Sequence, residues 1–152
     1  MKLPLDRRPV VIAIAGPNGA GKTTFYSSHL HSAGLRFINE DVLASELNAD
    51  SLRRQFVAQR ESFVFETVFS DPAGDKLAFL MQANDAGYNT ILCFIGISGS
   101  DVSEQRVAMR ISMANLRSAL TQLPNVWVFD NDDLRKPFRL VAVFENGVMR
   151  SP

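Results

Sequence analysis

Residues 10–23 read VVIAIAGPNGAGKT and join two patterns. Val10 to Ala15 is apolar throughout, which is typical of a central strand that is covered on both faces. Gly16 to Thr23 match the pattern G-x-x-x-x-G-K-[ST] at every fixed position. A buried strand that runs into a glycine loop and then into a helix predicts an open α/β sheet with a phosphate-binding loop after its first strand.

The chemistry of such a loop requires these residue types. Glycines can adopt positive φ and bring backbone N–H groups against phosphate oxygens with no Cβ in the way, and the next helix directs its positive dipole end at the same phosphates. Lys22 is expected to reach the β- and γ-phosphates, and the Thr23 hydroxyl to ligate Mg²⁺. A glycine-rich turn that only links strand to helix is the weaker alternative. The residues expected to contact ATP and Mg²⁺ are Gly16, Pro17, Asn18, Gly19, Ala20, Gly21, Lys22, Thr23 and Thr24.

Composition limits the class of protein. A chain of 152 residues has the usual size of one domain, so we expect a single domain over residues 1–152. Lys plus Arg and Asp plus Glu are each 16, and this zero net charge makes a nucleic-acid partner unexpected. Cys93 is the single cysteine, so no internal disulfide can form.

The distribution of apolar residues predicts where in the cell the protein is found. No stretch approaches the ~18 consecutive apolar residues of a transmembrane helix. Residues 1–9 have neither the apolar region nor the cleavage site of a secretory signal. We therefore expect a soluble, cytoplasmic protein with no membrane partner.

Further apolar runs alternate with segments of helical period, which is typical of parallel βαβ units. Strands are expected at 37–38, 63–65, 90–97 and 126–129, and a hairpin with a type I′ turn at 140–145 and 148–150. Helices are expected at 23–33, 75–86 and 103–120, the last as one helix or two. The predicted fold is the three-layer α/β sandwich of a P-loop NTPase of the kinase type, with a mainly parallel five-stranded sheet plus a C-terminal hairpin.

Acidic residues follow two of these strands, at the edge where open α/β sheets bind ligands. Asp41 is the candidate to accept the proton of an attacking hydroxyl, although an Asp at this position can also be only the N-cap of a helix from Val42. Glu66 ends an apolar strand, where a carboxylate costs free energy unless it holds Mg²⁺, water or a substrate donor. An ion pair with an Arg or Lys is its alternative. Thr67 and Ser70 are candidates to orient a sugar or nucleotide hydroxyl.

Polar residues further along the chain have two interpretations each. Arg106 and Arg110 are four residues apart and share one helix face. They are either a clamp on the transferring phosphoryl group or a solvated basic face, and spacing alone favours the solvated face. Asp130-Asn131 either lines the nucleotide or makes a turn, and we favour the turn.

Four segments in this order resemble the zeta toxin family of P-loop kinases, which belong to toxin–antitoxin systems. They are the glycine loop, FINED at 37–41, FETVFS at 65–70 and VFDN at 128–131, and the likeness extends from Pro9 to Val148. The resemblance implies an ATP-dependent kinase that phosphorylates a sugar hydroxyl of a nucleotide sugar, UDP-N-acetylglucosamine. It also implies an antitoxin protein as a partner.

The resemblance implies roles for individual residues. Lys22 and Thr23 match the family's ATP and Mg²⁺ residues, Asp41 matches its catalytic base, and Glu66 its acidic substrate-side residue. Arg106 and Arg110 match its arginine-bearing helix, which favours the clamp over the solvated face.

The chain departs from the family after Arg110. Relatives usually continue with a Gly-Gly-His-x-Val-Pro lid and a further arginine, whereas Arg110 here is followed by ISMANL. Either the lid has been lost, or the sequence lacks a mobile segment that the protein has; we favour the second, because lids are the mobile parts of such enzymes. A P-loop small-molecule kinase with a different acceptor and a non-catalytic ATP-binding module are the alternatives to a nucleotide-sugar kinase.

Overall fold

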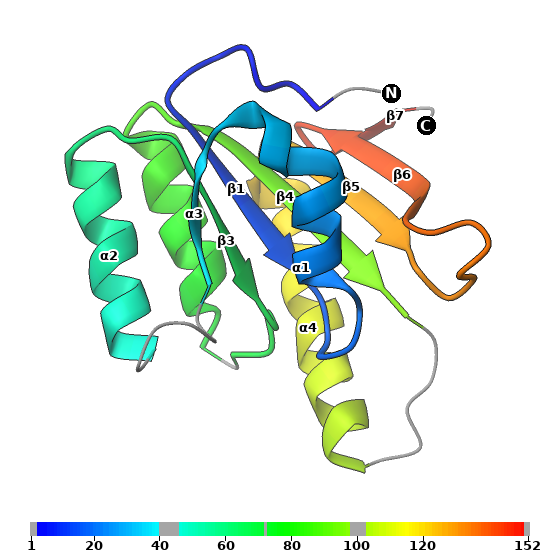
Figure 1. The fold of residues 1–152 in the computed structure, drawn as a ribbon. Coiled ribbons are helices and arrows are strands. Elements are labelled where there is room, and N and C mark those ends of the chain that lie inside the picture. The colour runs from blue at the N-terminus through cyan, green and yellow to red at the C-terminus, as the bar shows by residue number, and fades with distance from the viewer. Residues whose placement is uncertain (1–2, 40–45, 72, 98–102, 151–152) are drawn as a thin grey trace.

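The computed structural model describes residues 3–39, 46–71, 73–97 and 103–150, and for 46–47 and 103–109 it describes the backbone alone. The strands are β1 (Val10–Ala15), β2 (Arg36–Ile38), β3 (Phe63–Thr67), β4 (Asn89–Gly96), β5 (Asn125–Asp130), β6 (Arg139–Glu145) and β7 (Val148–Arg150) (Figure 1). The helices are α1 (Lys22–Phe25), which continues as a π-helical turn (Tyr26–Leu30) and a 3₁₀ turn (His31–Ala33), then α2 (Glu46–Ala58), α3 (Asp75–Asp85) and α4 (Ser103–Gln122). Residues 103–122 thus form one helix rather than two.

The strands form one sheet in the order β2-β3-β1-β4-β5-β6-β7. The first five in this order pair in parallel, and β6 and β7 add as an antiparallel hairpin. At the hairpin turn Asn146 has φ 50° and Gly147 has φ 80°, and a type I′ turn requires positive φ at both central residues. The predicted arrangement of five parallel strands and a terminal hairpin is confirmed.

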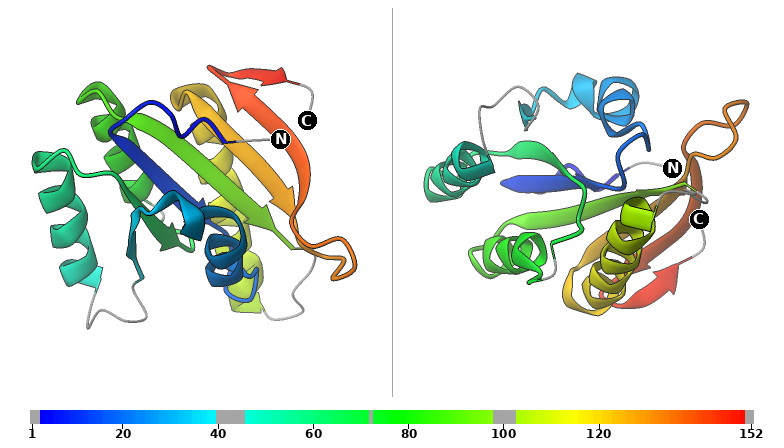
Figure 2. Two further views of the ribbon diagram at one scale, coloured as in Figure 1. Left: turned by 45° about the horizontal axis from the view of Figure 1, so that its top comes forward. Right: turned by 90° about the horizontal axis from the view of Figure 1, so that it is seen from below.

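Helices cover the sheet on both faces, so the molecule has three layers. In the right-hand view of Figure 2 the blue α1 segment lies on one side of the sheet, and the green α3 and yellow α4 lie on the other. The core is divided in the same way, because one buried cluster joins the sheet to α1 and the other joins it to α2, α3 and α4. Every residue of β1 is fully buried, as the unbroken apolar run predicts.

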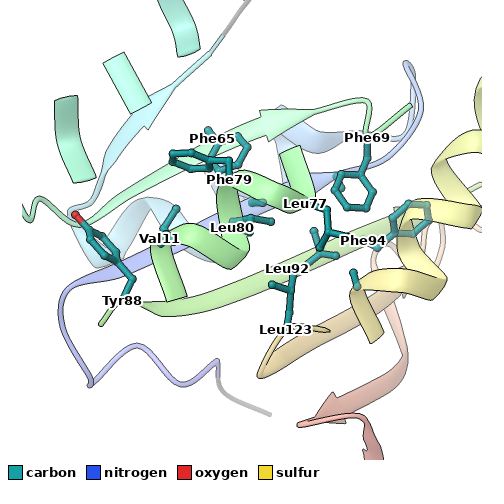
Figure 3. Packing of buried hydrophobic residues seen from close by; sticks show 14 of the residues in the cluster. Val11, Phe65, Phe69, Leu77, Phe79, Leu80, Tyr88, Leu92, Phe94 and Leu123 are labelled. Carbon is teal, nitrogen blue, oxygen red and sulfur yellow. The ribbon is translucent and has the colours of Figure 1, made fainter. Parts of the chain in front are cut away.

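Aromatic rings fill the layer between the sheet and α3. Figure 3 shows Phe65 of β3 against Phe79 of α3, with ring centroids 5.8 Å apart and planes at 79°. The single proton of the Tyr88 hydroxyl is shared between the carbonyls of Phe56 (3.0 Å) and Glu61 (2.8 Å). Burial raises the pKa of Tyr88, which favours the protonated form that makes this contact. This contact joins the end of α2 and the turn after it to the residue that precedes β4.

None of the helices in the described part of the chain combines the length and the apolar character needed to span a membrane.

The Leu80→Ala variant tests this core. Leu80 lies at 0% exposure in the cluster between the sheet and α3, so truncation should lower the free energy of unfolding by about 2–5 kcal/mol. The matched control is Leu134→Ala, because Leu134 is 83% exposed and should change stability by less than about 0.5 kcal/mol. Urea denaturation measures both, and equal losses would contradict the described packing.

Candidate functional site

The glycine loop connects β1 to α1, and its backbone conformation requires glycine. Gly16 has φ 156°, and a Cβ built there would overlap the backbone carbonyl oxygen of Ile95 on the neighbouring strand β4. Gly19 and Gly21 have φ 86° and 90°, a region that residues with a Cβ rarely adopt. The fixed glycines of the pattern therefore correspond to steric needs of this turn.

Hydrogen bonds close the loop on itself. The Gly16 N–H donates to the Thr67 carbonyl at the end of β3 (3.2 Å), and the Ala20 N–H donates to the Pro17 carbonyl (3.1 Å). The Lys22 ammonium donates to the carbonyl of Gly16 at 2.7 Å. These bonds hold the lysine within the loop and join the loop to the neighbouring strand.

A pocket of about 270 Å³ opens between this loop and the end of β3. The residues that line it are Asn18, Gly19, Gly21, Lys22, Thr23, Thr24, Glu66, Thr67 and Val68. The fold thus brings Glu66 and Thr67, more than forty positions later in the sequence, against the predicted phosphate loop (the Thr23–Glu66 separation is 43).

Thr23 and Glu66 make direct contact inside this pocket. The Thr23 hydroxyl donates to Glu66 Oε2 at 3.2 Å, and the Glu66 side chain is largely buried, at 7% exposure. A hydroxyl and a carboxylate are oxygen ligands of the kind that Mg²⁺ prefers. The described residues hold no cluster of three or more His, Cys, Asp or Glu side chains. This donor set fits an Mg²⁺ ion that takes one or two ligands from the protein and the rest from phosphate and water.

The loop after β3 is fixed by helix α4. The Phe69 N–H donates to Thr67 Oγ1 at 3.0 Å, and Phe69 has φ 62°, an unusual conformation for a bulky residue. The Asn115 side-chain amide donates to two carbonyls of this loop, both at 3.0 Å, and the Ser112 hydroxyl donates to the Val68 carbonyl at 3.0 Å. Because α4 supplies these bonds, its position determines the shape of one wall of the pocket.

The structure does not place the other predicted site residues at the pocket. Ser70 belongs to the same loop but does not line the pocket. Arg110 is exposed on α4. Asp41 and the side chain of Arg106 lie outside the described residues. Helix α4 continues without a break past Arg110, through the position at which the motif resemblance leads us to expect a lid.

For Asn131 the sequence favours a turn over a place beside the nucleotide, and the structure shows a further role. Its amide nitrogen donates to the Ala20 carbonyl in the glycine loop (2.9 Å), and its amide oxygen accepts from the Phe138 N–H (3.1 Å). Beside it, Arg139 donates to Asp130 at 2.9 Å and holds the pKa of that carboxyl below its usual range. The signals for Asn131 in the sequence are its place at the carboxyl end of a parallel strand and its membership of the VFDN segment at 128–131.

Comparison with solved structures shows the fold class. A structure from the PezAT chromosomal toxin–antitoxin system of Streptococcus pneumoniae matches with a TM-score of 0.64 at 12% identity, over 90% of this chain and 72% of that one. A gluconokinase from Sinorhizobium meliloti 1021 matches with a TM-score of 0.41 at 18% identity, over 86% and 89%. No protein-family model matches the chain. The chain has a P-loop NTPase-like α/β sandwich, as predicted, and the first likeness is consistent with the resemblance of the motifs to zeta toxins.

Replacing Gly16 by alanine tests the steric requirement of the loop. The new Cβ would overlap a backbone oxygen, so the free energy of unfolding should fall by about 2–4 kcal/mol. Gly34→Ala is the control, because Gly34 has φ 68° but open space around a Cβ, and it should cost about 1–2 kcal/mol. Thermal unfolding ranks the two variants, and a Gly34→Ala loss as large as that of Gly16→Ala would show that Gly16 is not in this close approach.

Proposed function

We propose that this chain is an ATP-dependent phosphotransferase that phosphorylates a hydroxyl of a small-molecule acceptor, a nucleotide sugar such as UDP-N-acetylglucosamine. The observation that carries the proposal is the pocket in which the glycine-loop backbone faces the Thr23–Glu66 pair. Phosphoryl transfer requires backbone N–H groups that bind phosphate and, beside them, oxygen ligands that bind a divalent cation.

The nucleotide side of the site is assigned to the loop. Bound Mg·ATP would supply the phosphoryl group and partly neutralise its charge. The backbone N–H groups of Gly19 and of Gly21 to Thr23 would bind phosphate oxygens, and the Lys22 ammonium would exchange its bond to the Gly16 carbonyl for the outer phosphates. Thr23 and Glu66 would hold the cation, directly or through water.

The residues that we assign to the acceptor are proposed from the sequence. Asp41 would take the proton from the attacking hydroxyl, Thr67 and Ser70 would orient the acceptor, and Arg106 and Arg110 would stabilise the transferring phosphoryl group. The bonds from α4 to the loop after β3 support the arginine assignment, because they couple the helix that carries both arginines to the wall of the pocket. Holding donor and acceptor together is most of what an enzyme contributes to this reaction.

The nucleotide-sugar acceptor and an antitoxin partner are proposed from the motif resemblance, and the fold likeness to a structure from a toxin–antitoxin system supports them. One observation favours a second candidate, a non-catalytic ATP-binding module. Helix α4 runs unbroken through the position of the family's lid, and Arg110 on it is exposed to solvent. Nucleotide binding without acceptor-dependent turnover would identify that module.

An acceptor-dependent ADP-release assay tests the reaction. Wild-type protein with Mg·ATP should release ADP faster when UDP-N-acetylglucosamine is added, and Asp41→Asn should lower kcat by about 10²–10⁴-fold because the general base is lost. The affinity for ATP should stay within about threefold, because Asp41 is assigned to the acceptor.

The control for this variant is Asp85→Asn, which removes an exposed carboxylate at the end of α3 and should leave turnover unchanged. ADP release that is the same with and without every nucleotide sugar supplied would reject this acceptor class. Product analysis by mass for a gain of one phosphate would then identify a different acceptor.

The Glu66→Gln variant tests the cation assignment. Removing the carboxylate charge beside Thr23 should raise the Mg²⁺ concentration that gives half-maximal ATP binding by about 10-fold or more. Glu61→Gln is the control, since Glu61 pairs with Arg36 at 3.6 Å and does not line the pocket. A magnesium titration that gives the same midpoint for wild type and Glu66→Gln would remove Glu66 from the cation site.

A further inference from the structure

The side chain of Asn131 bridges two segments that are far apart in the sequence. It lies directly after β5, and its amide nitrogen donates to the Ala20 carbonyl, 111 residues earlier, at 2.9 Å. Its amide oxygen accepts from the Phe138 N–H at 3.1 Å, just before β6 begins. Since one end of an amide can only accept and the other only donate, the Phe138 bond determines that the donor end faces Ala20.

This bond determines the orientation of the peptide between Ala20 and Gly21. A trans peptide is planar, so its carbonyl and its N–H point in opposite directions. Because the Ala20 carbonyl is held by Asn131, the Gly21 N–H is directed away from Asn131. Gly21 lines the pocket of the candidate site, and a glycine has little conformational preference of its own that would hold the plane. The plane therefore depends on a bond from outside the loop.

The Phe138 ring packs close to Gly21, beside the same peptide. A Cβ built on Gly21 would lie 3.0 Å from the Asn131 amide nitrogen and 3.3 Å from the Phe138 ring. Phe138 has φ 54°, its side chain is buried, and its ring meets that of Phe25 of α1 edge-on at 5.3 Å. The strained backbone and the packed ring hold the acceptor end of Asn131 in one place.

We infer that Asn131 is a positioning residue for phosphate binding, which presets the Gly21 N–H toward the phosphate chain of the nucleotide. The inference rests on the proposed function to the extent that the ligand is a polyphosphate. A donor that is already oriented needs no reorganisation when the anion arrives, and such preorganised donors stabilise charge far better than mobile ones. Asn131 itself is not assigned a contact with the ligand.

The chain contains a matched control at the opposite end of the same strand. Asn125 begins β5, and its amide nitrogen donates to Asn89 Oδ1 (3.2 Å) and to the Thr90 carbonyl (3.3 Å). It also joins neighbouring strands, but away from the glycine loop. Loss of the Asn125 bonds should therefore affect stability without affecting the binding of phosphate.

The experiment measures affinity and stability for Asn131→Asp, Asn131→Ala and Asn125→Ala in the full chain. In Asn131→Asp one oxygen can still accept from Phe138, but the other replaces the donor and faces the Ala20 carbonyl. Titration calorimetry with Mg·ATP and with magnesium pyrophosphate should show a Kd raised by about 10- to 100-fold for both Asn131 variants. Magnesium pyrophosphate is included because it has no nucleoside. Weaker binding of this probe by a variant therefore cannot come from lost contacts with a nucleoside.

Asn125→Ala should lower the melting temperature about as much as Asn131→Ala, with a Kd within about twofold of wild type. Asn131 variants that bind both probes as tightly as wild type would overturn the inference and leave the proposed function standing. Failure of the wild-type protein to bind either probe would instead reject the proposed function, and this inference with it.

A second measurement needs no ligand. A crystal structure of Asn131→Asp should show the Ala20–Gly21 peptide turned, because two oxygens cannot remain at hydrogen-bond distance with no proton between them. An unchanged peptide plane would also overturn the inference.

Discussion

The close approach of β1 to β4 at Gly16 is the constraint on which the rest of the site depends. Because no Cβ lies between Gly16 and the Ile95 carbonyl, the chain can leave β1 and turn back at once over the edge of the sheet. This turn places the Gly16 N–H on the Thr67 carbonyl and the Lys22 ammonium on the Gly16 carbonyl. The turn that carries one wall of the pocket therefore depends on a residue without a Cβ at position 16.

Three separate parts of the chain hold the walls of this pocket. β1 leads directly into the glycine loop. Helix α4 holds the loop after β3 through Ser112 and Asn115. The start of the β5–β6 connection holds Ala20 through Asn131. The ties from α4 and from Asn131 are side-chain bonds that end on backbone carbonyls of the loops beside the pocket.

Local patterns in the sequence predicted local structure well. The apolar run of β1, the glycine pattern and Asn146-Gly147 each express a requirement of a few neighbouring residues, and all three are found as predicted. The contact between Glu66 and Thr23 was predictable in part. The sequence placed both residues at the same edge of the sheet, but it did not predict that they bond to each other. The roles of Ser112, Asn115 and Asn131 could not be predicted, because each depends on a carbonyl of a segment 44 to 111 positions away. The roles of Asp41 and Arg106 stay predictions, since their side chains lie outside the described residues.

The bond between Asn131 and Ala20 has a consequence for synthesis on the ribosome. A chain is made from its N-terminus, so Ala20 of the glycine loop is translated 111 residues before its partner Asn131. β1 likewise waits for β3 and β4 before it has neighbours on both sides. A nascent chain therefore carries the complete loop sequence long before it has a loop of native shape. Premature termination after the loop and before residue 131 leaves a product that has the whole motif and lacks the residue that holds it in place.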